Sequence, residues 1–339
     1  MKKFSLVTVL IVAFIGITSQ GFAAGAIVRL GEALYKDLNL SRSGDQSCVT
    51  CHHPLAGFAD TSNHVDPINS PVSDGSAPIN PSDLFAFGGR NAPSAAYAGF
   101  SPALSCVPEP GGGLFCTGGM FWDGRATGQA ITDTGGIVVD GVATGPTFDP
   151  LADQAKGPFQ NPVEMNLIPE EVIEIVVQAK YARLFQRAFG YRVAKFASAH
   201  PEIVYNDIGI AITAFERSRE LNKFNSKFDR FAREQADKGI DVSTIAIDNF
   251  GVIVDGLGTL VKSKVYMAEE LEGLALFNMP TKGNCAACHP SGPITDPTDS
   301  QGKTLFTDFS YDNLGDPVNP LIVPILQDRR KLIWGSMAP

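Results

Sequence analysis

Apolar residues recur at helical spacing in several separate stretches of the chain, and these stretches predict a mostly helical fold. In the first stretch Ile27, Leu30 and Leu34 lie three or four positions apart, which places them on one helix face. Another helix is expected to begin at Pro169, because two glutamates follow it and suit the first turn. Further helices are predicted over residues 181–189, from a cap at Asn206 to about Leu221, and over residues 268–277. The fold class we expect is therefore all-α.

Glycine and proline are frequent between residues 54 and 162, so this region is expected to be mainly ordered loop. Within it, the Asp-Gly pair of the segment 137–142 stands between β-forming residues and predicts a small hairpin. A chain of 339 residues is long enough for two domains. We place their boundary where the helix near Leu221 ends, which gives domains over residues 27–220 and 221–339.

The first 26 residues have the pattern of an export signal. Lys2 and Lys3 precede an apolar run at residues 6–17, which is shorter than the ~20 residues of a membrane helix. Small residues follow, so cleavage is expected near Ala24 or Ile27. An uncleaved anchor is the alternative. We expect a periplasmic protein whose mature chain has no membrane span.

Two copies of the pattern Cys-x-x-Cys-His stand out in a chain with six cysteines and five histidines. The pattern is typical of c-type haem attachment, in which both thiols bond the haem and the histidine ligates its iron. A zinc site built from two cysteine pairs is the alternative, but the histidine after each pair favours haem. The two copies are Cys48-Val49-Thr50-Cys51-His52 and Cys285-Ala286-Ala287-Cys288-His289. We therefore expect two covalently bound haem c groups in two cytochrome c-like, loop-rich domains.

The two remaining cysteines, Cys106 and Cys116, are separated by a stretch that contains proline and glycine. Such a stretch can fold back on itself, and an exported protein meets oxidising conditions, so a disulfide is expected. Two free, buried thiols are the alternative.

The net charge of −9 becomes −11 once Lys2 and Lys3 leave with the signal. An acidic protein is a poor ligand for nucleic acid or for an anionic membrane surface. A small, basic cytochrome is a better match as a partner. The alternative is that the charge only maintains solubility.

Further segments around and between the haem motifs carry a resemblance to a known family. They are Leu34-Tyr35, Leu40-Ser41-Arg42-Ser43-Gly44, Gly89-Arg90-Asn91-Ala92-Pro93, Phe121-Trp122-Asp123-Gly124-Arg125, Gln154-Ala155-Lys156-Gly157-Pro158 and Asn161-Pro162-Val163-Glu164-Met165. Their order resembles the bacterial di-haem cytochrome c peroxidase and MauG superfamily over about residues 30–315.

The resemblance implies a division of labour between the two haems. The haem of His52 would be the site of peroxide chemistry, and the haem of His289 would pass electrons to it. Glu164 matches the distal glutamate, a group that can move a proton between the peroxide oxygens. Gln154 matches a glutamine that hydrogen-bonds distal solvent.

Two more residues receive roles from the same resemblance. Trp122 matches a tryptophan between the haems that can relay an electron; a buried aromatic anchor is the alternative. Asn91 matches a ligand of a calcium ion, to which its amide oxygen is suited; a turn residue is the alternative.

The chain departs from the family pattern in two places. No histidine stands in residues 82–89, where activation-gated peroxidases carry the sixth ligand of the first haem. His64 is the nearest free imidazole, and if it is a loop residue the haem is five-coordinate and open, which we favour. The C-terminal domain is also expected to be short, with Met337 as the formal candidate for the distal ligand of the second haem.

Three functions are compatible with these patterns. The leading one is an enzyme that reduces hydrogen peroxide with electrons from a small periplasmic cytochrome. The alternative is a MauG-like enzyme that oxidises tryptophan or tyrosine on a protein substrate. A plain di-haem electron carrier is disfavoured by Glu164, because such carriers fill both axial positions with strong ligands. A homodimer is a further expectation.

Overall fold

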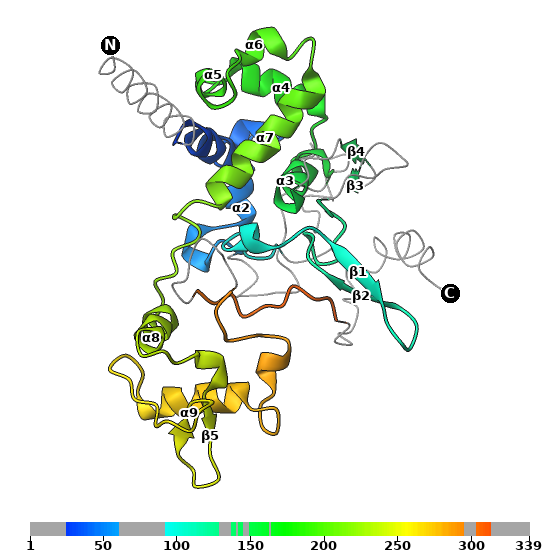
Figure 1. Ribbon diagram of the computed structural model, residues 1–339. Coiled ribbons are helices and arrows are strands. Elements are labelled where there is room, and N and C mark those ends of the chain that lie inside the picture. The colour runs from blue at the N-terminus through cyan, green and yellow to red at the C-terminus, as the bar shows by residue number, and fades with distance from the viewer. Residues whose placement is uncertain are drawn as a thin grey trace, which may run out of the picture. The chain divides into compact units, whose positions relative to one another are not determined.

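The computed structural model describes residues 25–60, 92–128, 137–139, 142–144, 149–162, 164–294 and 303–312, and its elements are labelled in Figure 1. Within these ranges helices dominate, and the strands form separate two-stranded sheets. This confirms the all-α expectation. The predicted hairpin is also confirmed, because β3 (Ile137–Val139) pairs antiparallel with β4 (Val142–Thr144), with Val139 opposite Val142.

The chain divides into two compact units. The first comprises Met1–Ser105, Gly118–Asn222 and Asp312–Pro339, and the second comprises Cys106–Thr117 and Lys223–Tyr311. The sequence had assigned residues 106–117 to the N-terminal domain. In the structure they join the second unit, where Thr117 forms an antiparallel bridge with Ser310. Each unit has its own hydrophobic core.

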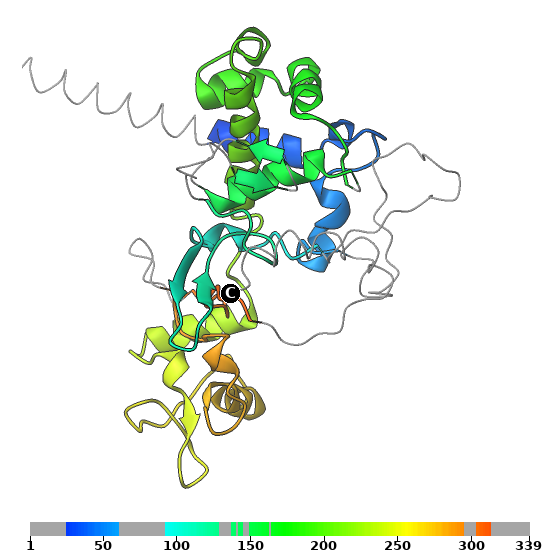
Figure 2. The same cartoon turned by 90° about the vertical axis from the view of Figure 1, so that its right-hand side faces the viewer.

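The first unit is built around α7, which packs against α3 and α4. Residues 25–35 form a helix that crosses α7 closely (Figure 1 and Figure 2): a Cβ at Gly31 would lie 1.8 Å from the carbonyl oxygen of Ala211. Glycine is therefore required at this crossing. The elements of the unit are η1 (Leu38–Leu40), α2 (Cys48–Cys51), η2 (Pro54–Ala56), η4 (Ala98–Phe100), α3 (Pro150–Gln160), α4 (Pro169–Gln178), α5 (Arg183–Phe189), α6 (Val193–Phe196) and α7 (Pro201–Glu216).

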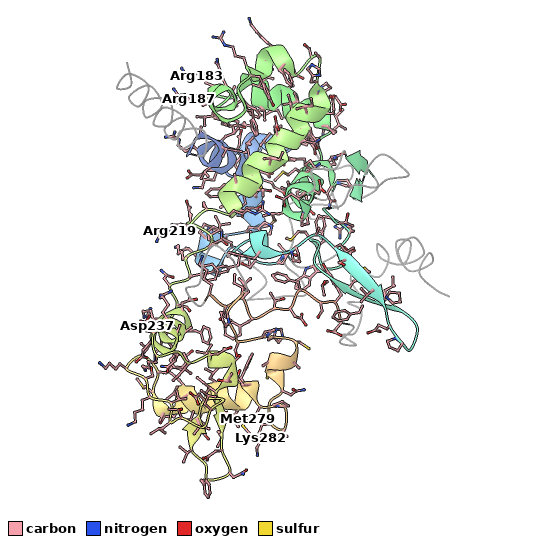
Figure 3. All side chains as sticks on the ribbon, in the orientation of Figure 1. Arg183, Arg187, Arg219, Asp237, Met279 and Lys282 are labelled. Atoms are coloured by element: carbon pink, nitrogen blue, oxygen red, sulfur yellow. A yellow bond between two sulfur atoms is a disulfide. The ribbon has the colours of Figure 1, made fainter. Side chains whose placement is uncertain are left out.

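Burial follows the helical period in these elements. On α5, for example, Phe185 is fully buried in the core. Arg183 and Arg187 lie two residues to either side of it and extend to the surface (Figure 3). The helix at Pro169 begins as predicted.

Two predictions in this unit were wrong. The segment of α3 was expected to be loop, but Asp149 caps a helix there by accepting a 3.1 Å hydrogen bond from the Leu151 N–H. The second error concerns α7, which begins at Pro201 and ends at Glu216, so Asn206 lies inside the helix and does not cap it.

A buried ion pair within α3 is hydrogen-bonded to α7. Asp153 and Lys156 are both 0% exposed, and Lys156 Nζ lies 3.2 Å from Asp153 Oδ1. The same ammonium group donates a 2.7 Å hydrogen bond to the amide oxygen of Asn206. Burial lowers the pKa of Lys156, and the charge of Asp153 opposes that shift. Asn206 therefore serves packing between the helices.

The second unit contains β1 (Ser105–Pro108), β2 (Leu114–Thr117), α8 (Lys227–Ala236), η5 (Val242–Thr244), β5 (Ala246–Ile247), β6 (Ile253–Val254), α9 (Ala268–Asn278) and η6 (Cys285–Ala287). Phe231 of α8 stacks on Tyr266 at a centroid distance of 4.1 Å in its core. The helix predicted over residues 268–277 is confirmed as α9. Helix α8 was not predicted; Ser226 caps it, accepting a 3.1 Å hydrogen bond from the Asp229 N–H.

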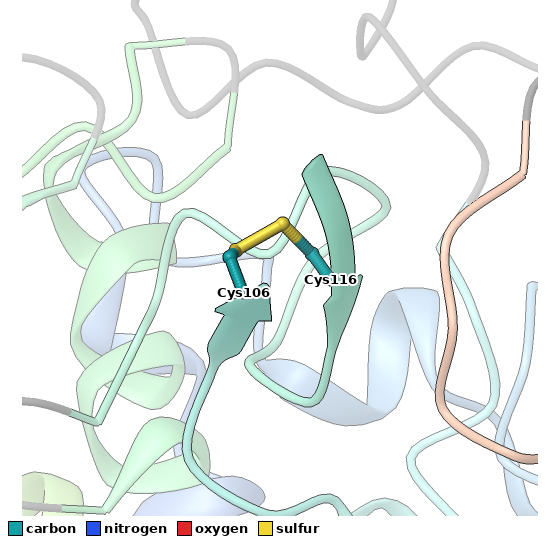
Figure 4. The surroundings of a disulfide bond; sticks show 2 residues. All are labelled: Cys106 and Cys116. Carbon is teal, nitrogen blue, oxygen red and sulfur yellow. A yellow bond between two sulfur atoms is a disulfide. The ribbon is translucent and has the colours of Figure 1, made fainter. Parts of the chain in front are cut away.

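Cys106 and Cys116 form a disulfide across β1 and β2 (Figure 4). The strands are joined by a turn in which the Gly112 N–H donates to the Glu109 carbonyl at 3.0 Å. Gly113 adopts a φ of 109°, a left-handed conformation that glycine reaches without strain. The Pro- and Gly-containing stretch thus reverses the chain and brings the two Cα atoms to 4.1 Å.

Thiol alkylation checks this bond. Under denaturing, non-reducing conditions neither Cys106 nor Cys116 is expected to react, and after reduction both should be labelled, because a disulfide sulfur has no thiolate to offer. Peptide mass spectrometry identifies the labelled sites. Alkylation of both residues without reductant would contradict the disulfide.

Two consecutive turns after β5 repeat the same hydrogen bonds. In each turn an aspartate Oδ1 accepts from the N–H groups two and four residues further on, at 2.9 and 2.8 Å. The aspartates are Asp248 and Asp255. The side chains at the two tips, Phe250 and Leu257, are 90% and 93% exposed. The backbone of both turns is therefore held by the aspartates and not by the tips.

None of the helices in the described ranges reaches the length and apolar character that a membrane crossing requires.

Candidate functional site

A pocket in the first unit collects five of the residues that the sequence had singled out. Its walls come from α2, α3, the turn after α3, and α7. The lining residues are Gln46, Ser47, Cys48, Cys51, His52, Gln154, Ala155, Pro158, Glu164, Met165, Ile212 and Glu216.

The first haem motif forms the single turn of α2. Ser47 precedes the turn, and its N–H donates a 3.0 Å hydrogen bond to the hydroxyl oxygen of Thr50. The His52 N–H donates to the Cys48 carbonyl at 2.8 Å, so the histidine follows directly on the turn that carries both thiols. Burial raises the pKa of Cys51 to about 12 and that of Cys48 further, so before haem attachment both groups are protonated thiols.

The ring of His52 is oriented by a backbone carbonyl. Its Nδ1 lies 3.1 Å from the carbonyl oxygen of Phe58, which the chain presents because Phe58 adopts a left-handed φ of 60°. A carbonyl only accepts, so Nδ1 carries the hydrogen, and Nε2 then has the lone pair that a metal requires. Burial lowers the pKa of His52, which keeps the imidazole in its neutral, ligating form. These groups together fit a covalently attached haem.

The carboxyl group of Glu164 is held by its own turn. The Glu164 N–H donates to the Asn161 carbonyl at 3.0 Å, and the side-chain amide of Asn161 donates to Glu164 Oε1 at 2.7 Å. Gln154 reaches the same pocket from α3. Pro158 has no N–H with which to bond the Gln154 carbonyl four residues earlier. The pocket therefore combines a fixed carboxyl group, an amide and the haem-attachment residues.

The second haem motif repeats the local geometry of the first. In η6 the His289 N–H donates to the Cys285 carbonyl at 2.9 Å. The His289 Nδ1 lies 2.9 Å from the carbonyl oxygen of Phe306, a residue that again has a left-handed φ, here 54°. Cys285 and Cys288 are exposed. This motif also presents two thiols and an imidazole whose Nε2 has the lone pair that a metal requires.

Trp122, which belongs to the first unit, does not line the first pocket and is 57% exposed. It follows Phe121, whose ring is covered by the Arg125 guanidinium at 3.6 Å. His64, Asn91 and Met337 lie outside the described residues. Across the described ranges, no group of three or more histidine, cysteine, aspartate or glutamate side chains is arranged to hold a metal ion.

Two pocket residues, Gln46 and Glu216, were not found from the sequence. Asn161 belongs to a segment that carried the resemblance, but its hydrogen bond to Glu164 was not predicted. Gln46 stands two positions before the first thiol and carried no signal of its own. Glu216 directly follows the apolar stripe of α7. A charged residue beside these apolar positions was the one available hint.

The family model described as di-haem cytochrome c peroxidase matches residues 25–237. Because this match covers more than half of the chain, the protein belongs to that family of haem-dependent oxidoreductases. The matched region contains the first haem motif together with Gln154 and Glu164.

Individual relatives agree with this assignment. Methylamine utilization protein MauG of Paracoccus denitrificans is 27% identical over 302 residues, which cover 88% of this chain and 58% of the relative. Cytochrome c551 peroxidase of Pseudomonas aeruginosa is 29% identical over 213 residues, which cover 62% of this chain and 43% of the relative. The crystal structure of the diheme peroxidase BthA from Burkholderia thailandensis is similar with a TM-score of 0.58 and 26% identity, over 90% of this chain and 57% of that one. The chain thus spans about half of the length of these relatives.

Proposed function

We propose that this protein is a periplasmic enzyme that reduces hydrogen peroxide with electrons from a small cytochrome. One observation carries the proposal: Glu164 and Gln154 share a pocket with Cys48, Cys51 and His52. An acid–base side chain, an amide and the haem-attachment residues are thereby placed around one cavity. A plain electron carrier needs no such carboxyl group there.

When bound, the haem supplies an iron that reacts with peroxide and exchanges electrons. Cys48 and Cys51 would hold it, and His52 would ligate it in the orientation fixed by the Phe58 carbonyl. Glu164 would accept a proton from one peroxide oxygen and deliver it to the other, which assists cleavage of the O–O bond. Gln154 would orient peroxide or solvent by hydrogen bonding.

The remaining roles concern electron supply. The second haem, held by Cys285, Cys288 and His289, would receive electrons from the cytochrome. We assign Trp122 as a relay to the first haem, since an indole is readily oxidised. A calcium ion at Asn91 and a homodimer belong to the same proposal.

The MauG-like alternative, oxidation of tryptophan or tyrosine on a partner protein, is favoured by a different observation. The match to MauG covers 88% of this chain, whereas the match to the cytochrome c551 peroxidase covers 62%. The two functions share the first pocket and differ in what supplies the electrons.

Turnover assays separate the two functions. Protein exported to a bacterial periplasm is first checked by mass spectrometry for the polypeptide plus two haems. Hydrogen peroxide is then added with a reduced small cytochrome c, and two cytochromes should be oxidised per peroxide, because the reduction takes two electrons. Peroxide consumption that needs no cytochrome but modifies tryptophan or tyrosine of an added protein would favour the alternative. A mass with zinc in place of haem would contradict both.

A further inference from the structure

A second carboxyl group faces the first pocket and has no part in the proposed reaction. Glu216, the last residue of α7, is 5% exposed and lines the pocket beside Cys48 and Gln46. Its Oε2 atom is buried and has no hydrogen-bond partner. Such an atom loses its hydration without compensation, which costs about 1–3 kcal/mol or more. The burial of this carboxyl group therefore calls for a functional explanation.

Other polar atoms of the first unit are also buried without a hydrogen-bond partner. The Gln46 amide nitrogen, which also lines the pocket, is buried without a partner. The Thr213 hydroxyl lies one helical turn before Glu216 and is buried without a partner, as is the Tyr35 hydroxyl. The ring of Tyr35 lies 5.2 Å from that of Phe215, the residue next to Glu216. Of these residues, Gln46 lines the pocket together with Glu216, and the charge of Glu216 helps to raise the pKa of Tyr35.

The electrostatics of Glu216 follow from this burial. Burial raises the pKa of Glu216 to about 8, against a lowering effect of the Arg217 charge. Arg217 itself is engaged by Asp149, to which it donates at 3.0 Å. The pKa of the Cys48 thiol is raised most by its own burial and next most by the charge of Glu216. The carboxyl group is therefore close enough to a haem-attachment residue to act on it electrostatically.

We propose that Glu216 tunes the first haem by taking up a proton when that haem is reduced and releasing it when the haem is oxidised. When the haem is reduced, one electron would pass from the donor to the iron, and one proton would pass from solvent to the Glu216 carboxylate. The oxidised haem carries one more positive charge, so a nearby carboxylate stabilises it, whereas a neutral carboxyl group does not. This inference rests on haem attachment at Cys48 and Cys51, not on peroxide turnover.

Other titratable groups interact with Glu216 or line the same pocket, and their titration must be separated from that of Glu216. Tyr35 approaches from helix 25–35, and Glu164 from the turn after α3. Cys48 and Cys51 become thioethers on attachment and no longer titrate. Arg217 and Asp149 form an ion pair beside α7. Glu164 is thus the main competing acid.

The test is a spectroelectrochemical titration of the full two-haem protein, with the haems distinguished by electron paramagnetic resonance. From about pH 6 to about pH 9, which brackets the pKa of Glu216, the potential of the first haem should fall with rising pH. The slope should approach one proton per electron, or about 59 mV for each tenfold change in proton concentration. In Glu216→Gln the slope should disappear, and the potential at the alkaline end should exceed that of the parent.

Two control variants isolate the effect. Glu174→Gln removes an exposed carboxylate of α4 and should keep the parent slope. Glu164→Gln should keep it as well, which excludes the competing acid. A persistent slope in Glu216→Gln, or its loss in Glu164→Gln, would overturn the inference.

The parent protein also tests the inference without any variant. Reduction of the haems in unbuffered solution with a pH indicator should show proton uptake near neutral pH. If Glu216→Gln does not incorporate haem, a flat potential in the parent between the same pH limits refutes the inference. If the protein showed no peroxide turnover, the proposed function would be wrong. The measurements of redox potential and proton uptake would still test this inference.

Discussion

Replacing Glu164 by glutamine is expected to slow peroxide turnover by about a hundredfold or more while both haems stay attached. The amide keeps the shape of the side chain but cannot take a proton from one peroxide oxygen and return it to the other. Asn161 fixes the carboxyl group at 2.7 Å, so the reacting group is held in place before peroxide arrives. The observable is the steady-state rate at saturating electron donor.

Glu174→Gln is the matched control, because it removes a carboxylate from the exposed face of α4 and should leave the rate unchanged. Visible spectra establish that both variants carry the same haem content. Turnover by Glu164→Gln at the parent rate would remove Glu164 from the mechanism and return it to a structural role.

Replacing Lys156 by methionine is expected to lower the free energy of unfolding by about 3–5 kcal/mol. Methionine retains most of the chain length, so the loss comes mainly from the Asp153 charge, which stays fully buried without its cation. Urea unfolding followed by circular dichroism measures the change. The control is Lys36→Met, which breaks an exposed pair with Glu32 and should cost less than about 1 kcal/mol.

The double variant Lys156→Met with Asp153→Leu tests the cause. Once both charges are gone, no charge of this pair remains buried, and most of the lost stability should return. If the double variant is as unstable as Lys156→Met alone, the cost arises from packing between α3 and α7 and not from the stranded charge.

Some helices with local signals were accessible from the sequence, although α8 was missed despite its cap at Ser226; helices defined by their neighbours were not accessible. Pro169 and the acidic residues after it marked the start of α4 through their own chemistry. Helix α3 was missed because it lies in the glycine- and proline-rich region 54–162, which was expected to be mainly loop; Gly157 and Pro158 belong to that region. They lie in the last turns of an eleven-residue helix, which contacts with α7 hold in place.

The site residues also divide into those that a local sequence pattern reveals and those that it does not. The haem-attachment residues were recognisable from spacing alone, because the chemistry demands two thiols and an imidazole within five positions. Gln154 and Glu164 required a resemblance to related proteins. The Phe58 carbonyl and the Glu216 carboxyl group reach their places only through a left-handed backbone turn and the crossing of α7, and no short pattern encodes either.

The paired turns after β5 have a practical consequence for labelling the protein. Asp248 and Asp255 hold each turn through backbone N–H groups, so the side chains at the tips contribute little to its conformation. Phe250 and Leu257 are therefore suitable sites for a single introduced cysteine that carries a fluorophore or spin label. Loop tips of this kind tolerate change well, and both lie in the unit that contains the second haem motif.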